Sequence, residues 1–247
     1  RFAQVSFAYE KGALVFDCLD LSLPLPQWVA VVGPSGCGKT TLINLLLRLY
    51  DVDTGAVMLN GRDIKEATLA SLRGRFAVAG QQPMLFDVSV AENITFGGRG
   101  FSRQQIEEAA AAACFHDFTV ALPQGYDTVI GEEGAKLSQG LKQRLALARA
   151  VIRDPDVLIL DEATSSVDSL PEERIFAALR RMRRGKSTLV VSHRLFSVQD
   201  ADRIFFVKGP RQVETGTHAE LLARSPDYRE FFRLQLAGEG ASRTSVS

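Results

Sequence analysis

The sequence predicts an α/β fold, for three reasons. Short, fully apolar segments suited to buried strands recur along the chain, and residues 28–32 are the clearest of them. Between these segments lie stretches whose apolar residues repeat at helical spacing, and the first contains Leu42, Leu45, Leu46 and Leu49. A glycine-rich turn joins that strand to that helix. Such alternation is typical of α/β proteins, in which helices cover a largely parallel sheet.

Composition is that of an ordinary globular chain and narrows the classes of function. The 247 residues are 46% hydrophobic and carry 29 basic and 29 acidic side chains, so a net charge of zero gives no reason to expect nucleic acid as a partner. Cys18, Cys37 and Cys114 are scattered without metal-ligand spacing, which argues against disulfides or zinc and favours a reducing compartment. No apolar run reaches the length of a membrane span.

The first part of the chain is expected to be an antiparallel β region, because residues 2–9 and 14–23 are short apolar runs separated at Lys11-Gly12. The chain opens on Arg1 and is strand-like within a few residues, so we interpret it as a domain of a longer protein. Tyr9 ends the first run. It suits either an ordinary core position or a platform that stacks on adenine.

Residues 33–41 fit the pattern G-x-x-x-x-G-K-[ST] between the predicted strand and helix. Their glycines bring backbone N–H groups at a helix N-terminus against phosphate oxygens. Lys39 then supplies a charge for the β- and γ-phosphates, and the Thr40 hydroxyl a ligand for Mg²⁺. The flanking strand and helix favour this interpretation over an incidental glycine-rich turn, so the sequence predicts nucleotide binding.

The middle of the chain combines a hairpin, a strand and a helical region. Residues 51–61 contain turn signals and predict a hairpin, and 76–79 predict a buried strand. Gln81 follows that strand and, taken alone, could be a solvated loop residue. Residues 93–123 are helical in character, with Ser102 and Gln105 as a capping box.

Further helices and strands follow towards the C-terminus. Ser138 is expected at the N-terminus of a long helix, where a serine is commonly structural, and Ser169 with Glu172 is expected to cap another. Residues 157–160 predict a buried strand that ends in two acids, Asp161 and Glu162, at the edge where α/β sheets place their ligands.

The last strands are predicted at 188–191, 204–207 and 213–215. His193 follows the first of them, a position that favours a contact with the γ-phosphate over a purely structural role. Thr217 with Glu220 is expected to cap a C-terminal helix, and the Gly/Ser/Thr-rich tail from Gly238 is expected to be disordered.

Taken together, these segments resemble the nucleotide-binding domain of an ABC transporter, from Arg1 to about Leu236. The family's motifs occur in its order: the A-loop aromatic at Tyr9, Walker A at 33–40, the Q-loop at Gln81, the signature at 137–141, Walker B at 157–162, the D-loop at 165–168 and the switch histidine at His193. Residues 128–134 and 216–222 resemble the exporter branch, in which this domain follows a membrane-spanning domain.

The resemblance implies a P-loop NTPase with a RecA-like core, an N-terminal antiparallel β subdomain and an α-helical subdomain. The nucleotide-binding domain would span 1–237, with the helical subdomain at about 84–152 and a disordered tail at 238–247. It implies an ATP hydrolase that uses ATP and Mg²⁺. The residues expected to bind nucleotide are Tyr9, Gly33, Pro34, Ser35, Gly36, Cys37, Gly38, Lys39, Thr40, Thr41, Gln81, Ser138, Gln139, Gly140, Asp168 and His193.

The same resemblance implies roles and partners. Glu162 would be the general base, supported by His193, Gln81 and Lys39, while Thr40, Gln81 and Asp161 would arrange Mg²⁺. Two such domains, identical or different, would close head to tail around two ATP molecules. Gln81 to Val90 and Gly131 to Gly134 would contact the membrane domain of the same transporter. The domain, itself soluble, would then lie at the cytoplasmic face of a membrane.

The chain departs from the family's pattern in its signature, which is Leu-Ser-Gln-Gly-Leu in place of Leu-Ser-Gly-Gly-Gln. Leu141 cannot make the polar contacts of the usual glutamine, and Gln139 adds bulk where glycine is usual. Two other functions remain open: a soluble ABC-type ATPase in DNA repair or translation, and a P-loop small-molecule kinase. The exporter-like segments disfavour the first, and the second leaves Ser138, Glu162 and His193 without a natural role.

Overall fold

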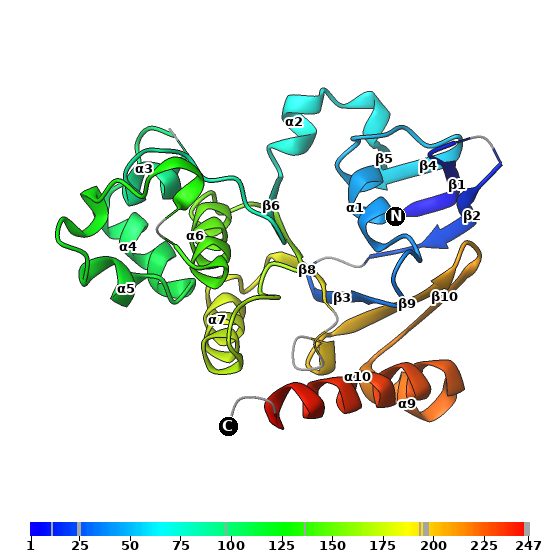
Figure 1. Ribbon diagram of the computed structural model, residues 1–247. Coiled ribbons are helices and arrows are strands. Elements are labelled where there is room, and N and C mark those ends of the chain that lie inside the picture. Colours follow the sequence, from blue (N-terminus) through cyan, green and yellow to red (C-terminus); the bar gives the residue numbers. More distant parts are fainter. Residues whose placement is uncertain are drawn as a thin grey trace. The chain divides into compact units, whose positions relative to one another are not determined.

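The structure is a computed structural model that describes residues 1–10, 12–23, 26–96, 98–135, 137–192, 194 and 198–244 (Figure 1). The chain divides into two compact units. Unit 1 consists of Arg1–Phe76 and Ser187–Ser247, and unit 2 of Ala77–Lys186. Because unit 2 lies within the sequence of unit 1, unit 1 is assembled from two distant parts of the chain.

Unit 1 contains the predicted antiparallel β region. Its strands lie in the order β2-β1-β4-β5, with Phe2 of β1 opposite Leu21 of β2 and Val57 of β4. The last two strands form a hairpin around Asn60-Gly61, at the end of the segment 51–61 in which the sequence predicts one. The bounds are Phe2–Ala8 for β1, Leu14–Leu21 for β2, Thr54–Leu59 for β4 and Arg62–Asp63 for β5.

A second set of strands in unit 1 follows the order β10-β9-β3-β8. The central strand, β3, is buried along its whole length, as its apolar sequence predicts. It runs parallel to β8 and β9, with Trp28 opposite Thr188 and Ala30 opposite Ile204, while β10 is antiparallel to β9. The bounds are Trp28–Val32 for β3, Ser187–Val191 for β8, Arg203–Gly209 for β9 and Gln212–Gly216 for β10.

One helix of unit 1 begins at a predicted capping box. Thr217 and Glu220 form the predicted capping box of α9. The sequence predicts disorder from Gly238, whereas α10 continues to Thr244; single glycines cost a helix only about 1 kcal/mol relative to alanine, and good helix formers flank them. The bounds are Lys39–Leu46 for α1, Ile64–Glu66 for the 3₁₀ helix η1, Leu69–Arg73 for α2, His218–Arg224 for α9 and Pro226–Thr244 for α10.

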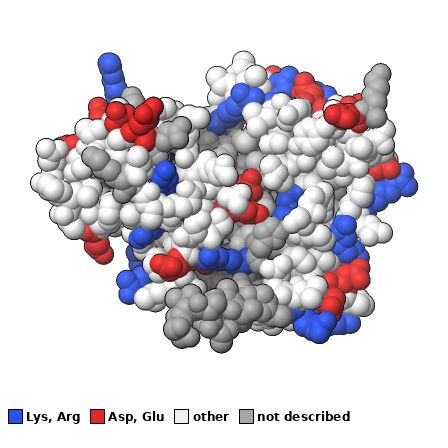
Figure 2. Space-filling view, viewed as in Figure 1, with Lys and Arg blue, Asp and Glu red and all other residues white. Residues whose placement is uncertain are grey.

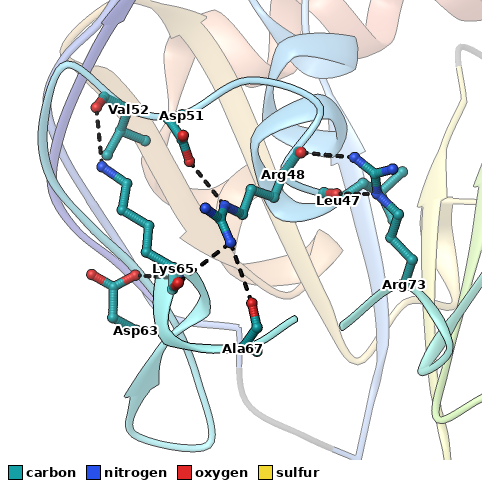
Figure 3. Close-up of polar contacts among 8 residues, drawn as sticks. All are labelled: Leu47, Arg48, Asp51, Val52, Asp63, Lys65, Ala67 and Arg73. Atoms are coloured by element: carbon teal, nitrogen blue, oxygen red, sulfur yellow. Dashed lines mark hydrogen bonds and ion pairs between the residues drawn. The ribbon is translucent and has the colours of Figure 1, made fainter. Parts of the chain in front are cut away.

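Two arginines hold the C-terminal end of α1 (Figure 3). Arg73 of α2 donates to the carbonyls of Leu47 at 3.1 Å and Arg48 at 2.9 Å, both of which lie past the last turn of α1. The Arg48 side chain donates in turn to the carboxylate of Asp51 and the carbonyl of Ala67. Carbonyls at a helix end have no partner within the helix. The bonds from Arg73 supply partners for the carbonyls at this end, and the contacts together fix α1, the helix that carries Lys39.

Unit 2 contains two strands and most of the helices. Residues 84–152, the predicted helical subdomain, hold α3 to α6. β6 and β7 are neighbours, and β6 starts at Phe76, the last residue of the first part of unit 1. The bounds are Phe76–Gly80 for β6, Val90–Thr95 for α3, Arg103–Ala112 for α4, His116–Val120 for α5, Gly125–Asp127 for η2, Glu132–Gly134 for η3, Gln139–Val151 for α6, Val157–Asp161 for β7 and Ser169–Met182 for α7.

Arg149 of α6 ties the segment after β6 to the helices of unit 2. Its guanidinium donates to the carbonyl of Asn93 at 2.8 Å and to that of Met84 at 2.7 Å, and it lies over the rings of Phe86 and Phe96. Burial lowers the pKa of Arg149 from its ordinary value. The Arg149 side chain, which belongs to α6, therefore fixes the backbone just beyond Gln81.

The predicted capping of α7 by Ser169 is wrong. Asp168 is the N-cap residue of this helix and its side chain makes no capping hydrogen bond, while Ser169 is the first helical residue. Glu172 is buried, and its carboxylate accepts a hydrogen bond from the Thr164 hydroxyl at 2.6 Å. This buried partner outcompetes the reciprocal bond that a capping box needs.

Charged side chains of both signs are interspersed on the face of the molecule shown in Figure 2. Basic and acidic residues are equal in number over the whole sequence. Among the described residues on that face, no broad area is uniformly basic.

Candidate functional site

Unit 1 places the Walker A residues between β3 and α1, as predicted. β3 ends at Val32 and α1 begins at Lys39, with Gly38 as a left-handed N-cap. A Cβ on Gly33 would lie 2.1 Å from the Val207 carbonyl oxygen of β9, so only glycine fits there. Pro34, Ser35, Gly36 and Thr40 are exposed, Cys37 is half-buried, and Gly33, Gly38, Lys39 and Thr41 are buried.

The Lys39 ammonium is held by its own loop. Its Nζ atom donates to the carbonyls of Gly33 and Pro34, each at 2.8 Å, and the side chain is 7% exposed. These two bonds satisfy a buried charge and fix the curvature of the loop around it. The arrangement agrees with a preformed phosphate-binding loop, whose role in binding ATP stays a prediction.

Tyr9 lies against the first turns of α1. Its hydroxyl is 3.1 Å from Thr41 Oγ1 and accepts a hydrogen bond from Asn44 Nδ2 at 3.1 Å. Its ring meets those of Phe7 and Tyr50 edge to face, at centroid distances of 4.9 and 5.0 Å. The side chain is 48% exposed, which does not fit a core residue. Tyr9 is thus a supported, exposed aromatic beside the phosphate-binding loop.

We expect Tyr9→Ala to weaken ATP binding several-fold, because stacking on the adenine contributes on the order of 1 kcal/mol. Tyr9→Trp should keep the affinity, since it keeps an aromatic face. Tyr9→Phe isolates the hydroxyl that contacts Thr41 and Asn44. Titration with a fluorescent ATP analogue measures all three. Equal affinities for the Ala and Trp variants would remove Tyr9 from the nucleotide site.

Cys37 offers a chemical probe of the same loop. It is half-buried, and its Sγ atom lies 3.9 Å from Lys39 Nζ. In a variant in which Cys18 and Cys114 are replaced by Ala, we expect maleimide to modify Cys37 and block ATP binding, and prior addition of MgATP to prevent the reaction. Mass spectrometry of the labelled peptide measures it. Labelling at the same rate with and without MgATP would place Cys37 away from bound nucleotide.

Unit 2 places the two adjacent acids at the C-terminal end of β7. Asp161 is the last residue of the strand, and Glu162 follows it in the left-handed region, with φ of +52°. Both are half-buried. A non-glycine residue in this region is uncommon and strained, and such residues cluster at functional sites. Their separate roles in metal binding and water activation stay a prediction.

The signature residues begin α6. Ser138 is its N-cap and accepts a hydrogen bond from the Leu141 N–H, as predicted. A Cβ on Gly140 would lie 2.6 Å from the Ser166 carbonyl oxygen of the D-loop, so the glycine allows a close approach of two backbones. Ser138 and Gln139 are exposed and Gly140 is half-buried. Asp168 is exposed at the start of α7.

Gln81 is exposed, and its backbone carbonyl is held by two side chains of α6. Gln139 donates to this carbonyl at 3.3 Å and Gln143 at 3.0 Å. Residues from these segments, including Gln81, Met84, Gln139, Lys142, Ser165 and Ser166, line a cavity of about 550 Å³. Sequence reasoning missed Gln143. The sequence signal that could have found it is a polar residue on the same helix face as Leu147 and Ala150, both of which are buried.

The structure therefore brings the predicted residues together in two groups. Tyr9 and the Walker A residues lie in unit 1, and Gln81, the signature, Walker B and the D-loop lie in unit 2. His193, the predicted switch residue, lies outside the described residues. Thr40, Gln81 and Asp161 offer the oxygen ligands that Mg²⁺ prefers, and their roles as ligands stay a prediction.

Comparisons with known proteins find one family model and many similar chains. The family model described as ABC transporter matches residues 16–165. An uncharacterised ABC transporter ATP-binding protein of Sinorhizobium fredii is 44% identical over 96% of this chain and 40% of the relative. An ATP-dependent lipid A-core flippase of Syntrophus aciditrophicus is 46% identical over 94% of this chain and 38% of the relative.

The fold is also similar to a solved structure. A bacterial Atm1-family ABC exporter with ATP bound matches with a TM-score of 0.91 and 38% identity, over 95% of this chain and 41% of that one. The chain thus spans about two fifths of the length of these relatives. Within the described residues, no helix is both long enough and apolar enough to cross a membrane.

Proposed function

This chain belongs to the ABC transporter family, as an ATP-hydrolysing nucleotide-binding domain of the exporter type, and on that premise we propose that it drives transport through a membrane domain outside its own residues. Two copies, or this chain and a related one, close head to tail around two ATP molecules. The membrane domain holds it at the cytoplasmic face. The observation that carries the proposal is the ordered phosphate loop with Lys39 buried at its centre, followed by Asp161 and Glu162 at the end of β7.

In the proposed mechanism each residue has a separate task. Lys39 and the backbone N–H groups of its loop bind the β- and γ-phosphates, and Tyr9 stacks on the adenine. Thr40, Asp161 and Gln81 would hold Mg²⁺, which would neutralise charge on the transferred phosphoryl group. Glu162 accepts the proton of the attacking water, and His193 contacts the γ-phosphate.

Because each signature serves the partner's ATP, the altered signature affects the opposite site. Ser138 keeps its hydroxyl and its place at the start of α6, and Gly140 keeps its close backbone approach. Leu141 removes one polar contact, worth about 0.5–1.5 kcal/mol, so the opposite site is weakened and not abolished. We propose a heterodimer in which this chain supplies a competent Walker site and a weakened signature.

The other two candidate functions are not favoured. The matched relatives are transporter ATP-binding proteins and exporters, of which this chain spans about two fifths. That extent supports a domain fused to further segments in preference to a separate repair or translation factor. A small-molecule kinase has no use for a signature at the start of α6.

Head-to-tail closure is tested by cross-linking in the full-length protein with its native cysteines replaced. Ser35→Cys of one copy and Ser138→Cys of the other should form a disulfide when ATP is added to a Glu162→Gln background, since both positions are exposed and belong to opposing motifs. Pairing Ser35→Cys with Gln212→Cys, which is also exposed, is the matched control. No ATP-dependent cross-link with the protein alone or with its partner chain, or no ATP hydrolysis by the assembled protein, would contradict the proposal.

A further inference from the structure

Gln143 has a buried side-chain amide that joins three separate segments of unit 2. The residue is 1% exposed and lies on α6. Its Nε2 atom donates to the Gln81 carbonyl at 3.0 Å and to Ser165 Oγ at 2.9 Å, and its Oε1 atom accepts from the Ser166 N–H at 2.9 Å. A single amide of α6, the helix that starts within the signature, thus contacts both the Q-loop and the D-loop.

The hydrogen bonds of Gln143 leave its amide a single orientation. A glutamine amide has two donor hydrogens, and both are used here. Reversing the amide would place its oxygen against the Gln81 carbonyl and its NH₂ group against the Ser166 N–H, losing two bonds in a buried site. The side chain therefore constrains both loops at once.

Gln139 adds a second donor to the same carbonyl. It lies four residues before Gln143, so the two side chains share one face of α6. Its Nε2 atom donates to the Gln81 carbonyl at 3.3 Å, and its side chain is exposed. The carbonyl has two lone pairs and can accept both. The longer, exposed contact makes Gln139 the weaker of the two. It is also a position at which this chain differs from the usual glycine.

We propose that Gln143 is a positioning residue for ATP hydrolysis, which transmits the position of the Q-loop to the signature and the D-loop, and that Gln139 braces the same contact. This inference rests on the proposed function. There, Gln81 serves the ATP bound by its own chain, whereas Ser138 and Gly140 of the signature serve the partner's. Movement of the Gln81 backbone on ATP binding shifts the Gln143 amide, and with it the residues presented to the other site. The two sites are thereby made cooperative.

The first test is enzymatic and uses the full-length exporter. Gln143→Met keeps size and burial but removes all three bonds, and Gln143→Glu keeps an acceptor for the Ser166 N–H while losing the donor to Gln81. For both we expect kcat to fall about tenfold, KM and ATP binding to change less than twofold, and the Hill coefficient for ATP to fall towards one. Gln104→Met replaces an exposed helical glutamine whose side chain donates to Glu108; it is the control and should change none of these.

Gln139→Gly sharpens the test, because both glutamines act on one carbonyl. Alone it should lower kcat about twofold to threefold, with a smaller fall in the Hill coefficient. Combined with Gln143→Met it should add little, since coupled residues are non-additive. Independent, multiplying effects would overturn the shared contact. A Gln143→Met variant with unchanged kcat and Hill coefficient would reduce Gln143 to a packing residue.

Hydrogen exchange gives a readout that does not require turnover and so separates this inference from the proposed function. Gln143→Met releases the Ser166 N–H and removes the shorter of the two bonds to the Gln81 carbonyl. We expect exchange at Ser166, and in peptides that cover 81–86, to accelerate at least tenfold, while β7 stays protected. Unchanged exchange in both loops would overturn the proposal even in an active exporter. Accelerated exchange in a protein that does not hydrolyse ATP would instead support the Gln143 contact and contradict the proposed function.

Discussion

Glu162→Gln in the full-length exporter is expected to lower ATP turnover by at least about 100-fold, the contribution typical of a general base, while ATP affinity stays within about twofold. The amide keeps the shape and hydrogen-bonding reach of the carboxylate but cannot accept a proton. Both side chains meet the same left-handed backbone at this position, so the substitution adds no strain of its own. The substitution is therefore expected to lower turnover without changing nucleotide binding.

The measurement is steady-state phosphate release together with binding of a fluorescent ATP analogue. Glu173→Gln, on the exposed side of α7, removes the same charge eleven residues away and should leave both values unchanged. If the partner chain supplies its own general base, the residual rate comes from the opposite site and disappears when that acid is also replaced. Near wild-type turnover with both acids replaced would remove Glu162 from the role.

Gly140→Ala is expected to lower turnover at least severalfold and to destabilise the fold by about 1–3 kcal/mol, the cost typical of overpacking. Helix propensity alone predicts the opposite, because alanine stabilises a helical position by about 1 kcal/mol relative to glycine. The new Cβ, however, would lie 2.6 Å from the Ser166 carbonyl oxygen, so the D-loop or the start of α6 has to move. ATP binding by Walker A of the same chain should persist.

Gly209→Ala is the matched control, because its Cβ meets nothing within 4 Å and its backbone is not left-handed. Phosphate release of both variants, with melting temperature as a check on folding, decides the outcome. A Gly140→Ala exporter that is more stable and equally active would show that helix propensity governs this position, and that the approach of the D-loop has no bearing on catalysis.

Local patterns in the sequence predict those parts of the fold that are determined by neighbouring residues. The apolar run of β3, the capping box at Thr217 and the N-cap at Ser138 occur where the sequence places them, because periodicity and capping act over a few residues. Asn60-Gly61 likewise turns the hairpin of β4 and β5. The candidate site residues come instead from the resemblance of the ordered motifs to a known family, and their roles stay predictions.

Features that depend on distant residues could not be predicted. Glu172 leaves the expected capping box because Thr164, on the preceding turn, gives it a buried hydrogen bond. No sequence motif at Gln143 indicates its contacts with Gln81 and Ser165, which follow two different strands. Tyr9 could be placed neither in the core nor at the surface until its contacts with Thr41 and Tyr50 were known. In each case the deciding partner comes from another part of the fold.

The parallel pairing of β3 has a consequence for how this protein is made. Its partner strands, β8 and β9, pair through residues such as Thr188 and Arg203, about 160–174 residues after Trp28 and Val29. At about 5–20 residues per second, a ribosome needs roughly 8–35 s to synthesise the intervening chain. Throughout that interval an entirely apolar strand lies without its partners in the nascent polypeptide. Residues 77–186 are contiguous and emerge complete in the meantime. Unit 2 is therefore expected to fold first, and the nascent β3 segment is where chaperones should bind.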